Sequence, residues 1–125
     1  MNKCKISIWG REFVLPVIYE CYDGEEVIES QKEAFTQFKE NSKKMNDSLE
    51  WVKQYIKKTS DAQQVDNEIE NVFKFVIPKS IFIPHRKSHL TVAIMCNYKF
   101  DMEHGIAVIF EKGRFKEIGS QDIVL

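Results

Sequence analysis

Large apolar side chains recur at every second position in the C-terminal third of the chain, and this period is the feature that most constrains the fold. It is clearest in residues 90–99, where the even-numbered positions are Leu90, Val92, Ile94, Cys96 and Tyr98. Successive side chains of a β-strand point to opposite faces, so the pattern predicts a strand that is half buried. Residues 106–118 continue the pattern around Lys112-Gly113, a pair typical of tight turns, and predict a hairpin.

The N-terminal residues 4–22 show the same two-residue period. Apolar side chains alternate on both sides of Gly10, and the segment Gly10-Arg11-Glu12 has the composition of a turn. We therefore expect residues 4–22 to form a second β-hairpin.

Residues 25–60 have instead the period of a helix, about 3.6 residues. Their apolar positions form two stripes, one of Ala34, Phe35 and Phe38 and one of Leu49, Val52, Tyr55 and Ile56. The spacings of Ser30 with Glu33 and of Asp47 with Glu50 are those of capping boxes and predict two helix starts. A weaker helical pattern covers residues 65–75 and ends before Pro78, and residues 81–83 predict a short strand.

Strands at both ends with helices between them predict an α+β fold. This order is best satisfied by an antiparallel sheet, built from the N- and C-terminal strands in residues 4–22 and 90–124, with the helices packed on one face. The 125 residues, 43% of them hydrophobic, suit one packed core, and no linker divides the sequence. We therefore expect residues 1–125 to form a single α+β domain.

The charge balance argues against two classes of partner. The chain has 18 Lys and Arg against 19 Asp and Glu, whereas non-specific nucleic-acid binding and attachment to anionic membranes both need a basic surface. No apolar run approaches the roughly 20 residues that span a bilayer, and the first residues lack the apolar core of an export signal. We therefore expect a cytoplasmic protein that binds neither nucleic acid nor membrane, with Cys4, Cys21 and Cys96 as reduced thiols.

The segment Asp101-Met102-Glu103-His104-Gly105, here called the 101–105 box, places two carboxylates and an imidazole between two predicted strands. Asp101 can accept a hydrogen bond from a following backbone N–H, and Gly105 can adopt a positive φ. His104 would then help to orient the turn. The sequence thus favours a structural turn at this position.

A second interpretation of the 101–105 box is a chemical site. Asp101, Glu103 and His104 offer the oxygen and nitrogen ligands of a divalent metal, or an acid and a base for hydrolysis. A metal site normally has three or four fixed ligands, and the further candidates, His85 and His89, flank basic residues that repel a cation. The sequence also lacks phosphate-loop, nucleophile-elbow and zinc-protease motifs. We therefore assign no catalytic residue, metal or cofactor.

Large aromatic side chains outside the predicted core could anchor another protein. Tryptophan and tyrosine concentrate binding energy at protein interfaces, and the candidates are Trp9, Trp51, Tyr22 and Phe100. Trp51 lies beside the apolar stripe of its helix, so we expect it to be half exposed. The candidate binding residues are therefore Asp101, Glu103, His104, Gly105, Trp51 and Phe100.

The C-terminal third resembles a family of small, uncharacterised bacterial domains. The resemblance lies in residues 96–110, CNYKFDMEHGIAVIF, and continues through Gly113, residues 115–119 and Gln121-Asp122. These domains share an aromatic–Asp–x–Glu–His–Gly box, a strand, a turn and a terminal Gly-x-x-Asp, and residues 24–26 and 30–34 match their N-terminal half. Met102 departs from the pattern, in which a proline or polar residue is expected.

This resemblance implies a role in binding another protein. Some relatives of these domains resemble immunity proteins, which bind and block a bacterial toxin. For this chain the resemblance implies a non-enzymatic protein-binding module of the bacterial cytoplasm with a toxin-like partner. The alternative is a small hydrolase or metal-binding domain that uses Asp101, Glu103 and His104. The sequence predicts no particular oligomeric state.

Overall fold

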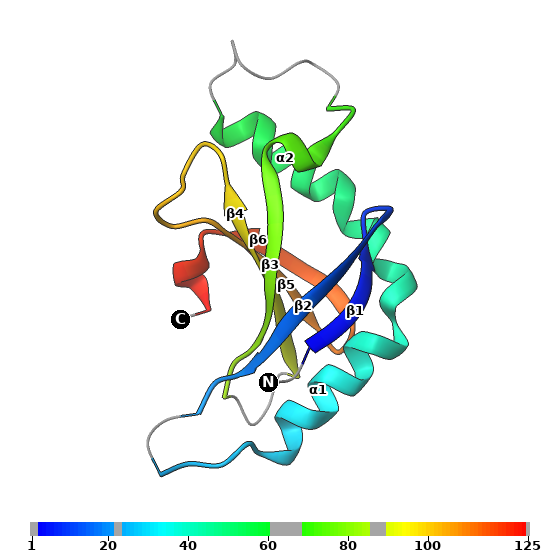
Figure 1. Ribbon diagram of the computed structural model, residues 1–125, viewed down its shortest axis with the longest axis vertical. Helices are drawn as coiled ribbons and strands as arrows, with labels where there is room; N and C mark the ends of the chain where they lie inside the picture. The colour runs from blue at the N-terminus through cyan, green and yellow to red at the C-terminus, as the bar shows by residue number, and fades with distance from the viewer. Residues whose placement is uncertain (1–2, 22–23, 61–68, 86–89, 125) are drawn as a thin grey trace.

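The computed structural model describes residues 3–21, 24–60, 69–85 and 90–124, whose arrangement is shown in Figure 1. The described part of the chain contains six strands and two α-helices and is an α+β protein, as the sequence predicts. The strands are β1 (Lys3–Ile8), β2 (Arg11–Tyr19), β3 (Val76–Ile83), β4 (Thr91–Tyr98), β5 (Ile106–Glu111) and β6 (Arg114–Gly119). The helices are α1 (Glu29–Glu40) and α2 (Ser48–Thr59), with the 3-10 segments η1 (Ser42–Asp47), η2 (Val72–Lys74) and η3 (Gln121–Ile123).

The strands form one sheet in chain order, from β1 at one edge to β6 at the other. Neighbouring strands are antiparallel except β2 and β3, which run parallel where Val17–Tyr19 lies beside Ile81–Ile83. Parallel strands need a long crossover connection, and both helices lie in the connection between β2 and β3 (Figure 1). The prediction of an antiparallel sheet is therefore wrong at this one pair, and the sheet is mostly antiparallel.

The centre of the sheet contains a strand that the sequence patterns misassign. β3 begins at Val76 and runs through Pro78, and its pairing with β4 shifts register between Pro78 and Ser80. Proline is tolerated at such an irregularity, where its missing amide hydrogen interrupts no regular ladder. Within the described residues 69–75 only η2 is helical, so the helix predicted for 65–75 is wrong there, and residues 65–68 lie outside the described ranges.

Both terminal hairpins close with two-residue turns in which both residues have positive φ, as a type I′ turn requires. The φ angles are 50° at Trp9, 86° at Gly10, 54° at Lys112 and 81° at Gly113. Trp9 is 6% exposed, and its Nε1 donates a hydrogen bond of 2.9 Å to the Ser48 Oγ at the start of α2. Trp9 therefore belongs to the core, and its prediction as an interface residue is wrong.

Both faces of the sheet are buried at β4 and β5, as β4 shows most clearly. Val92, Ile94, Cys96 and Tyr98 join the buried residues of both helices in the main core cluster. On the opposite face of the strand, a smaller cluster contains Phe82, Ala93, Met95, Ala107, Ile109 and Val124. The prediction of a half-buried strand is therefore wrong, because the C-terminal Val124 packs within the second cluster.

A buried polar side chain fixes the start of α1. Gln31 is 1% exposed, and its amide nitrogen donates to the carbonyl oxygens of Glu20 (2.9 Å) and Ile83 (3.0 Å), where β2 and β3 end. Its side-chain oxygen accepts the Ile28 N–H at 3.1 Å. The N-cap of α1 is Ile28, so the capping box predicted at Ser30 and Glu33 is wrong, and the box predicted at α2 is wrong as well because Asp47 makes no side-chain capping bond.

The three cysteines are free thiols, as predicted. Cys96 is completely buried in β4, and this burial raises the pKa of its thiol far above the ordinary value. The thiol therefore stays neutral and packs as a small apolar group. Among the described residues, no helix has the length and apolar composition needed to cross a membrane.

Candidate functional site

The 101–105 box forms the turn that the sequence predicts between β4 and β5. The Asp101 N–H donates to the Tyr98 carbonyl at 3.1 Å, and the Gly105 N–H donates to the Asp101 carbonyl at 2.9 Å. The Asp101 Oδ1 accepts the His104 N–H at 3.2 Å, so the carboxylate satisfies a backbone donor of the turn. Gly105 has a φ of +62°, a conformation that favours glycine.

The C-terminal segment closes over the end of this turn. A Cβ at Gly105 would lie 2.5 Å from both the Cys96 carbonyl oxygen and the Gln121 Nε2. That Nε2 donates to the same carbonyl at 3.0 Å, and the Gln121 N–H donates to the His104 carbonyl at 3.2 Å. Gln121 was not predicted as a site residue, and the signal that could have indicated it was its place in the terminal Gly-x-x-Asp segment.

Asp101 and His104 form an ion pair on the surface of the box. The His104 Nδ1 lies 3.1 Å from Oδ1 and 3.2 Å from Oδ2 of Asp101, and both side chains are nearly half exposed. The hydrogen bond from the His104 backbone is the main reason that the pKa of Asp101 is lowered. The pKa of His104 is raised, mainly by the hydrogen bond to Asp101 and its charge, and further by the charges of Asp122 and Glu103.

These pKa shifts limit the chemistry of the box. A protonated imidazole has no lone pair with which to accept a proton or to bind a metal, and the shift of His104 favours that protonated form. Glu103 is exposed to solvent, and His85 pairs with Glu25 at 3.2 Å. Across the ranges that the structure describes, no three His, Cys, Asp or Glu side chains gather to hold a metal ion, and His89 falls outside those ranges.

Phe100, although adjacent to the box, packs against the sheet. Its ring stacks on Phe75 with centroids 5.6 Å apart and meets Tyr98 edge-on at 5.6 Å. The Lys99 ammonium lies 5.8 Å from the centre of the Phe100 ring. Phe100 is therefore a half-buried packing residue. Tyr22, the other aromatic candidate near a strand end, lies outside the described ranges.

Trp51 lies on a different surface, between α2 and β6. Its side chain is 53% exposed, and its ring stacks on Phe115 with centroids 5.9 Å apart and an angle of 14°. The two rings border a shallow hollow of about 340 Å³, whose other lining residues are Lys44, Asp47 and Arg114. We call these five residues the aromatic surface. The structure thus joins Asp101, His104 and Gly105 in one turn, whereas Trp51 is paired with β6.

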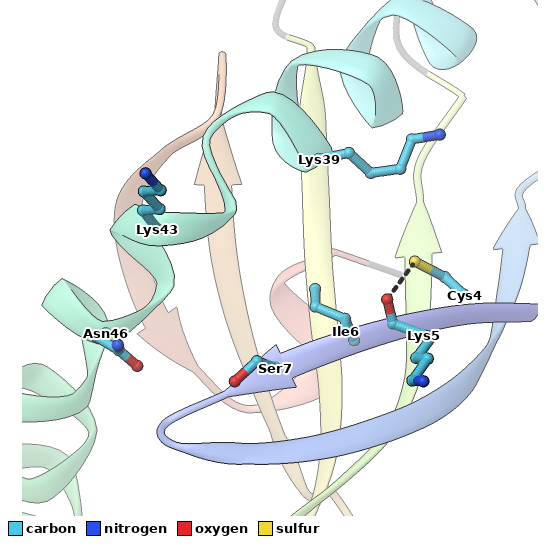
Figure 2. Close-up of a pocket in the computed structure, with 7 residues that line it drawn as sticks. All are labelled: Cys4, Lys5, Ile6, Ser7, Lys39, Lys43 and Asn46. Atoms are coloured by element: carbon cyan, nitrogen blue, oxygen red, sulfur yellow. Dashed lines mark hydrogen bonds between the residues drawn. The ribbon is translucent and has the colours of Figure 1, made fainter.

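A second hollow, of about 400 Å³, lies between β1 and the end of α1 with η1 (Figure 2). Its lining residues are Cys4, Lys5, Ile6, Ser7, Lys39, Lys43 and Asn46. Sequence reasoning missed this site because it joins segments more than thirty positions apart, which share no local pattern.

The segment η1 separates the two hollows. Side chains of a 3-10 helix repeat every three residues, so η1 presents three different rows. Lys43 and Asn46 line the hollow at β1, whereas Lys44 and Asp47 line the aromatic surface. Met45 is 2% exposed and belongs to the core.

The fold and the turn define a class of protein: a small α+β domain with a mostly antiparallel six-stranded sheet. A family model described as a domain of unknown function (DUF6985) matches residues 1–125, and the chain belongs to this family. Comparison with curated proteins and with solved structures found no match.

Proposed function

We propose that this protein is a non-enzymatic binding module for another protein, and that the partner docks on the aromatic surface. The observation that carries the proposal is Trp51, which is 53% exposed although it sits on a well-packed helix. Tryptophan and arginine are enriched among residues that dominate interface energies, and Arg114 borders the same hollow.

The aromatic surface is also rigid enough to bind without large reordering. The stack of Trp51 on Phe115 restrains the exposed ring, and α2 holds its backbone through the buried Val52 and Ile56. A side chain that is already ordered loses little conformational entropy on binding. Two cations, Lys44 and Arg114, and one carboxylate, Asp47, border the rings, and this excess of positive charge favours a partner that presents acidic groups around an apolar centre.

The packing of the helices supports this placement of Trp51. We propose that α1 and α2 both cover one face of the sheet within a single domain, because their buried residues share one cluster with the even-numbered residues of β4. The contact of α2 with β6 then brings Trp51 to the rim of that layer.

The class of partner that we propose is a bacterial toxin protein, met in the cytoplasm. This part rests on the resemblance of residues 96–122 to domains whose relatives include immunity-like proteins. An immunity protein acts by covering its toxin, which requires a preformed docking surface rather than a catalytic centre. The exposed tryptophan and its basic border supply such a surface.

A hydrolase or metal site at Asp101, Glu103 and His104 is the second candidate. Its support is the carboxylate held against the His104 Nδ1, an arrangement that orients catalytic and metal-binding histidines in other proteins. The geometry works against it, because both side chains are nearly half exposed and, among the described residues, no third His, Cys, Asp or Glu side chain completes a metal-binding group with them.

Photo-crosslinking in the native host cell tests the proposed function. A photoreactive phenylalanine analogue at Trp51 should give one adduct of defined mass. The same analogue at Val14, which is 61% exposed on β2, should not give it. We further expect the identified partner to be toxic when its gene is expressed alone. Co-expression of the wild-type chain should neutralise this toxicity, whereas co-expression of Trp51→Ala should not. No adduct from position 51, or the same adduct from both positions, would contradict the proposal.

A further inference from the structure

The pairing of β1 with β2 shows which backbone groups of β1 are bonded within the sheet and which point outward from its free edge. Its partner in the sheet is β2, with six consecutive pairs from Lys3↔Pro16 to Ile8↔Arg11. Ile8 and Arg11 flank a two-residue turn, so they form a hydrogen-bonded pair, and such pairs alternate along an antiparallel ladder. Ile6 and Cys4 therefore also bond to β2, whereas the backbone groups of Lys3, Lys5 and Ser7 point away from it.

These outward groups border the hollow between β1 and α1. Figure 2 shows the Lys5 carbonyl oxygen directed into the hollow, where it accepts a bond of 3.7 Å from the Cys4 Sγ. A thiol is a weak hydrogen-bond donor. The Lys5 carbonyl can therefore still accept a hydrogen bond from a stronger donor, such as a backbone N–H. A row of N–H and C=O groups beside an open space is a template for another strand.

The opposite edge of the sheet is built differently. The pairing of β6 with β5 shifts register between Ile109 and Phe110, and such a bulge twists an edge away from regular pairing. Trp51 also stacks over Phe115 of that strand. Of the two edges that the structure describes, β1 is the regular one, and its ladder runs without a register shift.

Lysines border the β1 edge on both faces of the sheet. Lys3 and Lys5 are exposed on the face opposite the buried Ile6 and Ile8. Lys39 and Lys43 lie on the helix side (Figure 2) and are exposed, and the Lys39 ammonium lies 4.5 Å from the centre of the Phe35 ring. The charge of Lys39 also acts on the thiol of Cys4, whose pKa is raised mainly by burial and lowered in part by this lysine. Lys5 already forms an exposed ion pair with Glu12 of β2 at 3.2 Å, so the positive charge that an added strand would meet comes mainly from Lys3 on one face and from Lys39 and Lys43 on the other.

We propose that the edge of β1 binds an extended acidic peptide segment of a partner as an additional strand. The backbone of that segment would pair with Lys5 and Ser7, and its alternating carboxylates would meet the lysines of the two faces. A second copy of this chain fits less well, because pairing two β1 edges would bring Lys3 and Lys5 of one copy against those of the other. This binding site is separate from the aromatic surface and does not depend on Trp51.

Amide exchange and peptide titration test this proposal. The probe is a labelled peptide of alternating glutamate and valine, about nine residues long. On binding, the amides of Lys5 and Ser7 should become protected from hydrogen exchange, whereas that of Ile6, already bonded to β2, should change little. The affinity should fall as salt increases, since the lysines are exposed.

Matched variants separate the charge from the backbone pairing. Lys39→Glu with Lys43→Glu should weaken binding by about tenfold or more, whereas Lys57→Glu with Lys58→Glu, at the end of α2, should leave it within about twofold. A peptide methylated at alternate backbone nitrogens keeps its charge but cannot pair, and it should not bind. Ser7→Pro removes one outward N–H without interrupting the bonds to β2, and it should weaken binding. Trp51→Ala should have no effect.

Three results would overturn the proposal. They are no binding at millimolar peptide, equal binding of the methylated peptide, and protection that spreads evenly over Ile6 and its neighbours. Dimerisation of the free chain that is abolished by Ser7→Pro would instead assign the edge to a second copy. The two proposals can fail separately. Absence of peptide binding at β1 would leave the proposed function at the aromatic surface intact, and absence of crosslinking at Trp51 would leave the β1 site intact.

Discussion

Gly105 lies at the most crowded point of the box, where positive φ and close packing coincide. Gly105→Ala would place a Cβ 2.5 Å from the Cys96 carbonyl oxygen at a φ of +62°. We expect unfolding in urea to show a loss of about 2–4 kcal/mol, from left-handed strain together with crowding. Gly10 is the matched control, with a φ of +86° and open space around it, so Gly10→Ala should lose only about 1 kcal/mol. Equal losses at the two positions would contradict this account.

The Asp101–His104 pair predicts a specific dependence on pH. The pKa of His104 is raised above 6.5 in the folded state, so its contribution to stability is present below that value and is lost as pH rises through the folded pKa. The pKa of Asp101 is lowered below 3.8, so its contribution is present above that value and is lost as pH falls through the folded pKa. The pair should therefore stabilise most between these two limits.

An NMR titration of the His104 ring checks this interpretation. We expect its pKa to lie above the ordinary value in the wild type and to fall in Asp101→Asn, which keeps the shape but removes the charge. Asp47→Asn, within the aromatic surface, should leave the titration unchanged. A His104 pKa that is ordinary or low in the wild type would mean that the ion pair does not form in solution.

The metal alternative at the same residues gives a different forecast. An ion that binds only the native state raises the melting temperature by mass action. We expect Zn²⁺, Mn²⁺ and Ca²⁺ each to leave the melting temperature unchanged, because no group of three His, Cys, Asp or Glu side chains that could hold a metal ion is present among the described residues. A rise of several degrees that disappears in His104→Ala would favour the metal or hydrolase candidate instead.

At the scale of elements, the junction of α1 with β2 and β3 depends on one side chain. Gln31→Leu would leave the Glu20 carbonyl and the Ile28 N–H without their Gln31 partner, whereas the Ile83 carbonyl would keep the Glu20 N–H. Unsatisfied buried groups are costly, so we expect a loss of about 2–4 kcal/mol in chemical denaturation. The matched control is Gln37→Leu on the same helix, where the side-chain amide bonds to the exposed Glu33 and the loss should be below about 1 kcal/mol. A small loss at Gln31 would show that these groups find other partners.

The elements also show where sequence patterns succeed. The hairpin of β5 and β6 and the turn at 101–105 were predictable because each depends on neighbouring residues: the Lys112-Gly113 pair, Asp101 and Gly105. β3 was misassigned because Pro78 usually ends an element, and only its pairing with β4 shows that a bulge accommodates it. The parallel contact with β2 and the buried face of Ala93 were not predictable, because both depend on segments distant in sequence.

The same distinction applies to the candidate sites. The half exposure of Trp51 was predictable from its place beside a helical stripe, whereas its stack on Phe115 and the proximity of Arg114 follow from the packing of α2 on β6. The role of Gln121 depends on its hydrogen bond to Cys96, and the hollow at β1 depends on the approach of α1 and η1 to that strand. Both contacts join segments that are distant in sequence. Local periodicity therefore gives the surface residues, and tertiary structure gives their partners.

For the whole molecule, the two proposed sites lie on either side of η1 and present basic groups to their partners. The formal charge of the chain is only −1, so these groups mark local surfaces rather than a generally basic protein. Attraction between exposed charges is screened at physiological salt beyond about 8 Å. Acidic partners should therefore be selected by close contact at these surfaces and not by long-range attraction.

The most direct test of the central claim is the dissociation constant of the crosslinked partner, measured by calorimetry with Trp51→Ala and with Val14→Ala. Both side chains are more than half exposed, at 53% and 61%, so neither belongs to the core, and circular dichroism of each variant checks that the fold is kept. If the aromatic surface is the docking site, Trp51→Ala should weaken binding by about tenfold or more, and Val14→Ala should change it by less than about twofold. Equal affinity of the wild type and Trp51→Ala would contradict the claim.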